Sequence, residues 1–565
     1  MKRLSIVLVA LVMTAGSLVV PSGVSQAGTE PGTGPATGAV RIPDPLQRGP
    51  YPIDRIEYDG GIVTVSAPPG VVTPERLMGS IHLPEREGPF PLVILVHGRH
   101  STCEFVERVE FLLWPCPDAR PATADVRSYE GYDYLAGNLA SHGYVVASIS
   151  ANAINTFDLA MLDSGMQMRA HLVAHTLDLF STWNKEVGPR EVEGRLIGMI
   201  DFDRIGLMGH SRGGEGVARF VEFNRTRTDG PTYKGLRAVF ALAPTDFDRQ
   251  EVPGVHFGTL LPICDGDVYN LQGAWMYDDA RYSKPERFAR VQFTVAGANH
   301  NFFNTVWTYD DGEFGGDGQG TNPACVPDNP GSVRLDAQEQ RNVGLALMGA
   351  FFRRYLGNDT RLDPLMTGGA GLPRGACPEK LSCSRVVGTS YVAPAAARRT
   401  VLVPQSDMYR AIGFDRAMEC ETDTTGAGCD TVPTWSTARQ LSLEWTERAV
   451  IRIPVRDVGG FESVTLRAGM NFGSQLNEGI DEQSLLVALV DKEGRRSTVS
   501  TARFSEALRR PFGPDHQVLT LNGIRIPLRA FSGVDLDSIV RLDLIFGETT
   551  RRGSVQILDI AFQGR

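Results

Sequence analysis

Between residues 51 and 358, short apolar runs alternate with longer stretches of helical periodicity, and this alternation limits the possible folds most strongly. Several runs are apolar without interruption, as expected of strands covered on both faces. Strands that alternate with helices predict an α/β fold with a doubly wound, mostly parallel sheet. The predicted strands span 91–96, 144–148, 204–208, 238–243, 260–264 and 291–296, and the predicted helices span 132–141, 166–184, 214–223 and 336–356.

The pattern changes after residue 358. A connector over 359–398 is rich in proline and glycine, and the chain beyond it has many short alternating runs with little helical periodicity. Such a pattern is typical of an antiparallel sandwich. We therefore predict a separate all-β domain over 399–565, with strands at 449–455, 463–467, 485–490, 518–521, 539–546 and 555–562.

The first 27 residues have the pattern of a cleaved secretory signal peptide. Lys2 and Arg3 precede an apolar run over 4–20, and Ser25 and Ala27 place small residues where a signal peptidase cuts. Residues 28–50 are rich in Gly, Pro and Thr and predict a flexible leader. No later segment is apolar enough to cross a bilayer. We expect a secreted, extracellular monomer without a transmembrane segment, cleaved near Ala27.

Composition limits the partners of the chain. Hydrophobic residues make up 42% and charged residues 22%, which is ordinary for a globular protein. The formal net charge is -10, so the broad positive surface that binds a phosphate backbone is not expected. Nucleic acid is therefore not a predicted partner.

Eight cysteines favour an oxidising destination. Loop closure is easiest over short spans, so the simplest pairing joins sequential cysteines. A zinc site is the alternative, but the sequence has no C-x-x-C pair and we expect no metal. The predicted disulfides are Cys103–Cys116, Cys264–Cys325, Cys377–Cys383 and Cys420–Cys429.

The segment Gly209-His210-Ser211-Arg212-Gly213 lies between a predicted strand and a predicted helix. This is the G-x-S-x-G nucleophile elbow in the structural context that it requires. A chain of this composition would contain the motif about 0.4 times by chance, so the context carries the prediction. Ser211 is the predicted nucleophile.

A serine hydroxyl needs a base to take its proton, and the base needs a carboxylate to orient it. His300 follows the predicted strand 291–296, while Asp265 and Asp267 both follow the strand 260–264. The order serine, acid, histidine fits this kind of elbow. We prefer Asp267 as the acid because it lies deeper in the loop, and Asp265 remains the alternative.

An oxyanion hole needs two backbone NH groups. Arg212 follows the nucleophile and supplies the first. The second comes from the loop after the strand 91–96, where Arg99 is preferred and Gly98 is the alternative.

These motifs carry a resemblance. The segment 209–214, the pair His97-Gly98 and the triplet Ala298-Asn299-His300 are similar to the chlorophyllase, dienelactone-hydrolase and polyester-hydrolase branch of the α/β-hydrolase superfamily. The resemblance implies an eight-stranded sheet, ester hydrolysis through an acyl-enzyme and no cofactor. The chain departs from the family pattern in having two candidate acids and an insertion over 101–131, which we expect to form one wall of the substrate cleft.

The region over 399–565 more loosely resembles jelly-roll modules of secreted carbohydrate-active enzymes, mainly in 523–528 and 539–546. Trp435 and Trp445 are candidates for a sugar platform, but tryptophan is usually buried, so core positions are favoured. His171 and His175 are four residues apart on a predicted helix, yet they lack the Glu of H-E-x-x-H, so hydrogen-bonded roles are favoured over metal binding.

The loop 310–318 gathers carboxylates that would suit calcium, although a solvated loop is the simpler interpretation because the EF-hand spacing is missing.

The sequence thus predicts a secreted serine hydrolase that cleaves a carboxylic ester, with polymeric or surface-bound esters among the candidate substrates. A serine peptidase, an acyltransferase or a non-catalytic surface- or carbohydrate-binding protein are the alternatives.

Overall fold

The computed structural model describes residues 42–68, 70–105, 112–116, 122–282, 286–312, 323–404, 407–420, 439–456, 458–471, 473–510 and 521–564. The predicted signal peptide and most of the predicted leader lie outside these residues. Among the described residues, no helix combines the length and apolar character needed to cross a bilayer.

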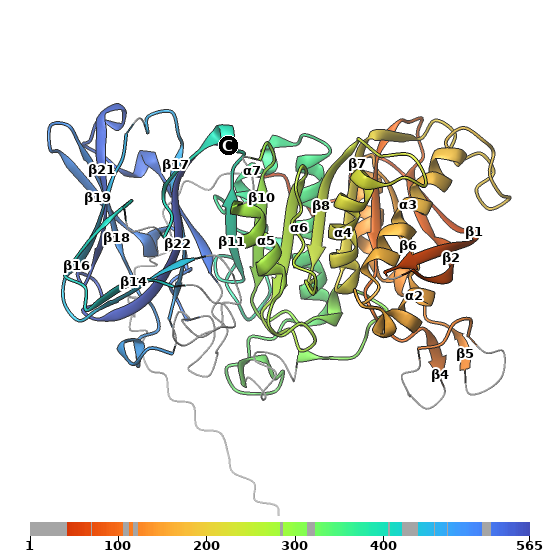
Figure 1. Cartoon of the computed structure of the whole chain (residues 1–565), viewed down its shortest axis with the longest axis horizontal. Helices are drawn as coiled ribbons and strands as arrows, with labels where there is room; N and C mark the ends of the chain where they lie inside the picture. The colour runs from red at the N-terminus through yellow and green to blue at the C-terminus, as the bar shows by residue number, and fades with distance from the viewer. Residues whose placement is uncertain are drawn as a thin grey trace, which may run out of the picture. The chain divides into compact units, whose positions relative to one another are not determined.

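A nine-stranded mixed sheet forms the first part of the fold (Figure 1). Its strand order is β1-β2-β6-β3-β7-β8-β9-β10-β11. The strands from β6 to β10 are parallel, whereas β1, β2 and β11 pair antiparallel with their neighbours. The bounds are β1 (Ile53–Ala67), β2 (Val71–Pro84), β3 (Phe90–Val96), β6 (Val145–Ile149), β7 (Ile200–His210), β8 (Leu236–Leu242), β9 (His256–Pro262), β10 (Arg290–Val295) and β11 (Val387–Val392).

Helices cover both faces of this sheet, which explains the continuous apolar runs of its strands. In β3, Leu92 and Ile94 belong to one core, while Val93 points to the other. The first core includes side chains of α3, α4 and α5, and the second includes side chains of α1 and α6. The bounds are α1 (Asp133–Ser141), α3 (Met166–Trp183), α4 (Arg212–Thr226), α5 (Gly273–Tyr282) and α6 (Ala337–Tyr355).

Two antiparallel sheets form the second part of the fold. The six-stranded sheet has the order β14-β15-β22-β17-β20, with β12 also paired to β22, and the five-stranded sheet has the order β13-β16-β21-β18-β19. Side chains of both sheets share one core, in which Trp445 is fully buried. The bounds are β12 (Arg398–Leu402), β13 (Arg410–Ile412), β14 (Arg416–Cys420), β15 (Gln440–Trp445), β16 (Ala449–Pro454), β17 (Ser463–Met470), β18 (Leu486–Asp491), β19 (Arg496–Ser500), β20 (Asn522–Pro527), β21 (Ile539–Phe546) and β22 (Gly553–Gln563).

Short elements complete the described chain. The pair β4 (Cys103–Phe105) and β5 (Ala122–Asp125) forms a small separate sheet inside the predicted insertion. The remaining helices are α2 (Asn152–Phe157), α7 (Asp363–Met366), η1 (Ser128–Tyr132), η2 (Asp158–Ala160), η3 (Asn301–Phe303), η5 (Pro323–Cys325), η6 (Thr360–Leu362), η7 (Arg374–Ala376), η8 (Ala395–Ala397), η9 (Gln475–Asn477), η10 (Thr501–Arg503), η11 (Leu528–Ala530) and η12 (Leu536–Ser538).

The structure has one strand more in the large sheet than the resemblance implies. The segment predicted as a connector supplies β11, which pairs with β10 at the edge of the sheet. The hairpin of β1 and β2 is a further element that the sequence pattern does not predict. The expected strand at 518–521 falls almost entirely outside the described residues.

Three predicted disulfides are present: Cys103–Cys116, Cys264–Cys325 and Cys377–Cys383. The fourth, Cys420–Cys429, extends outside the described residues, as does Trp435.

Candidate active site

Ser211 lies in a sharp turn between a strand of the large sheet and a helix that packs on this sheet. Strand β7 ends at His210 and helix α4 begins at Arg212, so a single residue connects them. The backbone of Ser211 has φ 58° and ψ -126°, a conformation that is rare outside glycine. Its NH donates to the carbonyl of Leu242 on β8 at 2.9 Å. The turn therefore stores backbone strain at the predicted nucleophile, which is common at functional sites.

Two glycines permit close packing around this turn. A Cβ atom at Gly209 would lie 2.0 Å from the carbonyl oxygen of Gly213, so only glycine fits there. A Cβ atom at Gly98 would lie 2.5 Å from Cβ and 3.1 Å from Oγ of Ser211. The loop after β3 is thus in direct contact with the serine, as the oxyanion prediction requires.

His97 orders that loop. Its Nε2 accepts a hydrogen bond from the NH of Ala151 at 2.8 Å, so Nδ1 carries the proton and donates to the Gly98 carbonyl, also at 2.8 Å. Burial lowers the pKa of His97 to about 3, which keeps the ring neutral and this tautomer in place. Asn155 Nδ2 donates to the same carbonyl at 3.1 Å. The carbonyl is held from two sides.

The two predicted oxyanion donors are next to the contact between the serine turn and the loop after β3: Arg212 follows Ser211, and Arg99 follows Gly98. Arg212 is the first residue of α4, a position whose NH has no partner inside the helix. None of the hydrogen bonds among the described residues uses the backbone NH of Arg99 or Arg212. Among the described residues, neither NH group has an acceptor in the protein.

His300 contacts Asp265, which differs from the sequence preference for Asp267. Nδ1 of His300 lies 2.9 Å from Oδ2 of Asp265, and both side chains are 1% exposed. Asp267 is 64% exposed and its Oδ2 lies 3.7 Å from Nε2, on the other side of the ring. The reason is local: Oδ1 of Asp265 accepts from the NH groups of Asp267 and Val268, at 3.0 and 2.6 Å, which turns Asp265 inward.

The surrounding carboxylates control the protonation of His300. Burial is the largest single influence and lowers the pKa of His300, but the carboxylates of Asp265, Asp267 and Asp311 together outweigh it, with Asp265 contributing most. The net effect raises the pKa above its ordinary value of about 6.5. Burial also raises the pKa of Asp265. The pair therefore keeps its shared proton to higher pH than an isolated histidine would.

His210, the variable residue of the motif before Ser211, connects the serine turn to His300. Its Nε2 lies 3.1 Å from the His300 carbonyl and its Nδ1 lies 3.0 Å from the hydroxyl of Tyr132. The rings of His210 and His300 are 4.9 Å apart, and Trp307 packs on His210 at 4.6 Å. Burial lowers the pKa of His210 well below its usual range, so the neutral ring donates through Nε2. Nothing in the sequence distinguishes His210 from a spacer residue.

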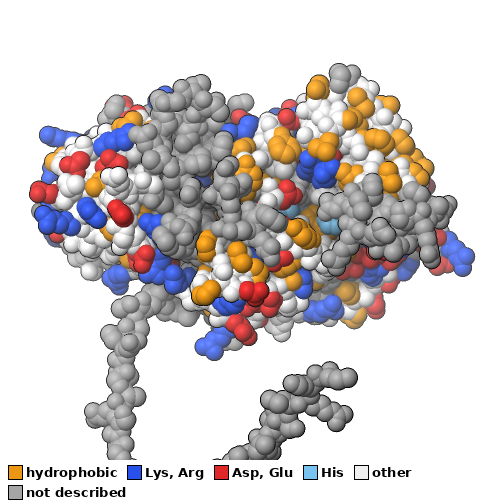
Figure 2. Space-filling model, turned by 90° about the horizontal axis from the view of Figure 1, so that it is seen from below, with side chains coloured by type: hydrophobic (Ala, Val, Ile, Leu, Met, Phe, Trp, Pro, Cys, Tyr) orange, Lys and Arg blue, Asp and Glu red, His pale blue; other side chains and the backbone are white. Residues whose placement is uncertain are grey.

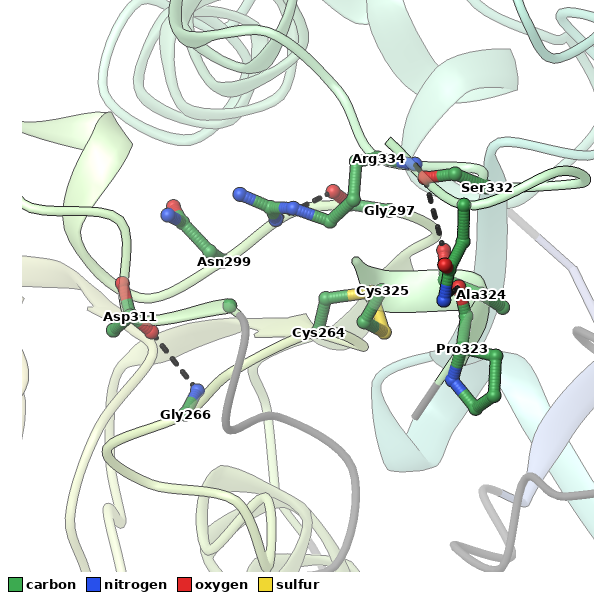
Figure 3. Close-up of a disulfide and its surroundings, with 12 residues drawn as sticks. Cys264, Gly266, Gly297, Asn299, Asp311, Pro323, Ala324, Cys325, Ser332 and Arg334 are labelled. Atoms are coloured by element: carbon green, nitrogen blue, oxygen red, sulfur yellow. Dashed lines mark hydrogen bonds between the residues drawn. A yellow bond between two sulfur atoms is a disulfide. The ribbon is translucent and has the colours of Figure 1, made fainter. Parts of the chain in front are cut away.

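Asp311 joins the acid loop to the histidine loop. Its Oδ2 accepts from the NH of Gly266 at 2.9 Å and from the NH of His300 at 3.0 Å, and its Oδ1 accepts from the NH of Asn301 at 3.0 Å. Figure 3 shows the contact with Gly266. Asp311 is only 7% exposed. This carboxylate, predicted to be solvated or to bind calcium, serves as an acceptor for the site's own backbone.

The segment around Asp311 is itself anchored. Arg334 donates to the Gly297 carbonyl at 2.9 Å and to Asp310 at 2.7 Å. The disulfide Cys264–Cys325 joins the residue before Asp265 to the short helix η5 (Figure 3). Residues 313–322 lie outside the described chain. The disulfide connects η5 to the loop after β9, and Arg334 connects Asp310 to the Gly297 carbonyl in the loop after β10.

Other predicted candidates have structural partners. Nδ1 of His171 lies 3.1 Å from the hydroxyl of Ser66, and Nε2 of His175 lies 3.2 Å from the Thr64 carbonyl. Trp445, which is buried in the core shared by the two antiparallel sheets, donates through Nε1 to the Thr550 carbonyl. Within the described part of the chain, no group of three or more His, Cys, Asp and Glu side chains is placed to hold a metal ion.

Apolar side chains are exposed in the segments that adjoin the serine turn. Phe157 and Leu159 are 41% and 67% exposed, and Phe247, three residues after Pro244 on the loop from β8, is 47% exposed. The NH of Thr245 on that loop lies 3.4 Å from the carbonyl of Ser211. Figure 2 shows a small area of histidine surface beside hydrophobic side chains on one face of the molecule. The segments that adjoin the serine turn therefore present apolar side chains to solvent.

Comparisons with models of known protein families and with curated protein sequences find no match.

Proposed function

We propose that this chain is a secreted serine hydrolase of the α/β-hydrolase superfamily that cleaves carboxylic esters. The observation that supports this best is the strained Ser211 at the end of β7, in contact with Gly98 and linked through His210 to a buried pair of His300 and Asp265. Each part has the chemistry that acyl transfer needs. The parts come from the carboxyl ends of four strands of one sheet, β3, β7, β9 and β10, or from the loops that follow them.

In this proposal His300 is the base. Its Nδ1 proton is held by Asp265, which leaves Nε2 as the acceptor, and Nε2 is buried without a hydrogen-bond partner among the described residues. Contacts between a nucleophile and its base are often longer in substrate-free enzymes than in complexes. We expect the hydroxyl of Ser211 to donate to Nε2 when substrate is bound.

The reaction then follows from the positions of these groups. Oγ of Ser211 attacks the ester carbonyl carbon while its proton moves to Nε2 of His300, and the NH groups of Arg99 and Arg212 hold the oxyanion. The alcohol leaves with the proton from His300, which yields an acyl-serine. Water then attacks the acyl carbon, gives a proton to His300, and releases the acid and free Ser211.

Export and the role of the second part of the chain complete the proposal. The pattern of residues 1–27 and three disulfides support secretion. We propose that the antiparallel sheets form a jelly-roll-like sandwich that holds the enzyme on a polymer or surface, or stabilises it. The chain would act as a monomer and without a cofactor.

The test is covalent labelling with a fluorophosphonate, followed by mass spectrometry of the labelled peptide and by assays with esters of graded acyl length. Labelling of Ser211 and ester hydrolysis are expected in the wild type, and Ser211→Ala should lose both, with turnover reduced by ~10³ to 10⁶. Wild-type protein that is folded but neither labelled nor active would favour a binding protein. Labelling without ester turnover would favour a peptidase or an acyltransferase.

A further inference from the structure

Three arginines surround one buried carboxylate beside Ser211. Asp158, at the start of η2, is completely buried. Its Oδ1 lies 3.2 Å from Nε of Arg99, and its Oδ2 lies 2.9 Å from a terminal nitrogen of Arg169 and 2.9 Å from one of Arg212. Three guanidinium groups share one carboxylate, so the cluster carries a surplus of two positive charges.

A nearby acid does not remove this surplus. The buried Glu75 is close enough to Arg169 to interact with it electrostatically. Burial, however, raises the pKa of Glu75 to about 8, so this carboxyl group is mainly protonated at neutral pH. Burial also lowers the pKa of Arg212, and the charges of Arg169 and Arg99 act in the same direction. Among the described residues, the positive charge is therefore poorly compensated.

The three arginines have different roles. Arg169 is fully buried and also donates to Asn155 and to the carbonyls of Ser164 and Gly165, so its hydrogen bonds stabilise the folded chain. The side chains of Arg99 and Arg212 are 30% and 13% exposed. Among the described residues, no side chain or carbonyl accepts from the terminal nitrogens of Arg99. Arg99 and Arg212 are the members that a ligand can reach.

Both of these arginines adjoin the reacting atoms. Arg212 directly follows Ser211, and Arg99 directly follows Gly98, where an added Cβ atom would lie 3.1 Å from Oγ of Ser211. The guanidinium of Arg212 also lies over the ring of Phe247, 5.7 Å from its centroid. An anionic group bound here would be a few bonds from the scissile ester, with an apolar contact on one side.

We propose that the substrate is an ester that carries a second, free carboxylate, and that Arg99 and Arg212 bind this carboxylate. The inference rests on the proposed function and specifies its substrate class. Guanidinium groups bind carboxylates through two parallel, charge-assisted hydrogen bonds. A neutral ester offers no charge to match the surplus of the cluster, whereas the second carboxylate of a half-ester does.

Matched substrates test this selectivity. Ethyl hexanoate and monoethyl adipate have the same acyl length and release the same alcohol, so ethanol release measures both. We expect wild-type kcat/KM to be about tenfold or more higher for monoethyl adipate, the factor associated with one charge-assisted hydrogen bond. Arg99→Gln should remove most of this ratio, and added salt should reduce it. Equal values in the wild type, or a ratio unchanged in Arg99→Gln, would overturn the proposal.

The control variant is Arg225→Gln, at the other end of α4. Arg225 is solvent-exposed and pairs only with Glu222 among the described residues. This substitution removes the same charge from the same helix, so it should leave the substrate ratio unchanged. A ratio that falls equally in Arg225→Gln would mean that net charge alone sets the preference, which would also overturn the proposal.

A binding measurement separates this inference from the proposed function. Adipate should bind the wild type and Arg225→Gln with equal affinity in calorimetry, and about tenfold more weakly to Arg99→Gln. Adipate binding without fluorophosphonate labelling would support the anion site and contradict the hydrolase. Labelling of Ser211 without any difference in adipate binding between the wild type and Arg99→Gln would support the hydrolase and contradict the anion site.

Discussion

The substitution Asp265→Asn tests the catalytic arrangement most directly, because the structure dictates how the new amide must be oriented. One carboxylate oxygen of Asp265 accepts two backbone NH groups, from Asp267 and Val268. The other oxygen lies 2.9 Å from Nδ1 of His300. In the variant the amide oxygen must stay with the two NH donors, so the amide NH₂ group faces the histidine.

The consequence is a change of tautomer. An NH₂ group is a donor, so Nδ1 of His300 must become the acceptor and its proton must move to Nε2. Nε2 is then unable to take the proton of Ser211. The same substitution in the trypsin-like template lowers turnover by ~10⁴, and we expect a similar loss here, equivalent to about 5.4 kcal/mol of transition-state stabilisation. KM should change little.

Asp267→Asn is the matched control. It makes the same chemical change two residues away in the same loop, but Asp267 is 64% exposed and lies 3.7 Å from Nε2 rather than from Nδ1. We expect its turnover to stay within about tenfold of the wild type, since an exposed charge is largely screened by solvent.

Steady-state ester kinetics on the pH plateau would be measured for both variants, with thermal unfolding to confirm that each is folded. A folded Asp265→Asn enzyme with more than a tenth of wild-type turnover, or a greater loss in Asp267→Asn, would refute this reasoning.

Three further predictions concern the loops that hold His300, Asp311 and the disulfide Cys264–Cys325. Because the net effect of its surroundings raises the pKa of His300, kcat/KM should fall as pH decreases through a value above about 6.5; a midpoint at or below 6.5 in the pH profile would contradict this. Asp311→Asn should lower kcat by about tenfold at constant KM and move the midpoint of the pH profile to lower pH, because a negative charge near His300 is lost. A variant that loses only thermal stability would show that Asp311 is a purely structural residue. Replacing Cys264 and Cys325 together with serine should lower the free energy of unfolding by about 4 kcal/mol, since the bridge closes a separation of 61 residues; a loss below about 1 kcal/mol in chemical denaturation would contradict this.

The central strands and the long helices of the large sheet could be predicted because their sequence pattern has a direct physical cause. In β3, adjacent apolar residues serve different cores, so Leu92 and Val93 must both be apolar. A strand with helices on both faces cannot alternate with polar residues. The same condition holds for β6, where every residue is buried.

The edges of the sheet lack that pattern. In β1, exposed and buried residues are mixed along 15 residues, and its pairing with β2 shifts register between Asp59 and Ile62. In β11, only Ser390 and Val392 are buried, and the strand follows a segment rich in glycine and proline. Such edge strands form their ladder hydrogen bonds with a single neighbouring strand, and that neighbour is not readable from the local sequence.

The structure places Asp265, and not the preferred Asp267, against Nδ1 of His300 for a different reason. Depth in a loop is a poor criterion, because the orientation of a side chain depends on its own backbone contacts. Asp265 accepts the NH of the residue two positions ahead, an Asx turn that aspartate before glycine favours. This turn points the second carboxylate oxygen at the histidine and leaves Asp267 at the surface. The signal is present in the local sequence, in Asp265-Gly266, and turn chemistry is the better guide.

The remaining parts of the site come from residues that no motif identifies. Asp311 lies 45 residues beyond Gly266 in sequence, yet it accepts hydrogen bonds from both loops of the acid–base pair. Asp158 lies between strands in sequence but holds arginines from the loop after β3 and from the first turn of α4. A motif such as G-x-S-x-G can identify the reacting group, because the tight turn around that group requires particular residues at neighbouring positions. The residues that orient that group act over long sequence separations, so only the folded chain brings them together, and they are where selectivity and pH dependence should be sought.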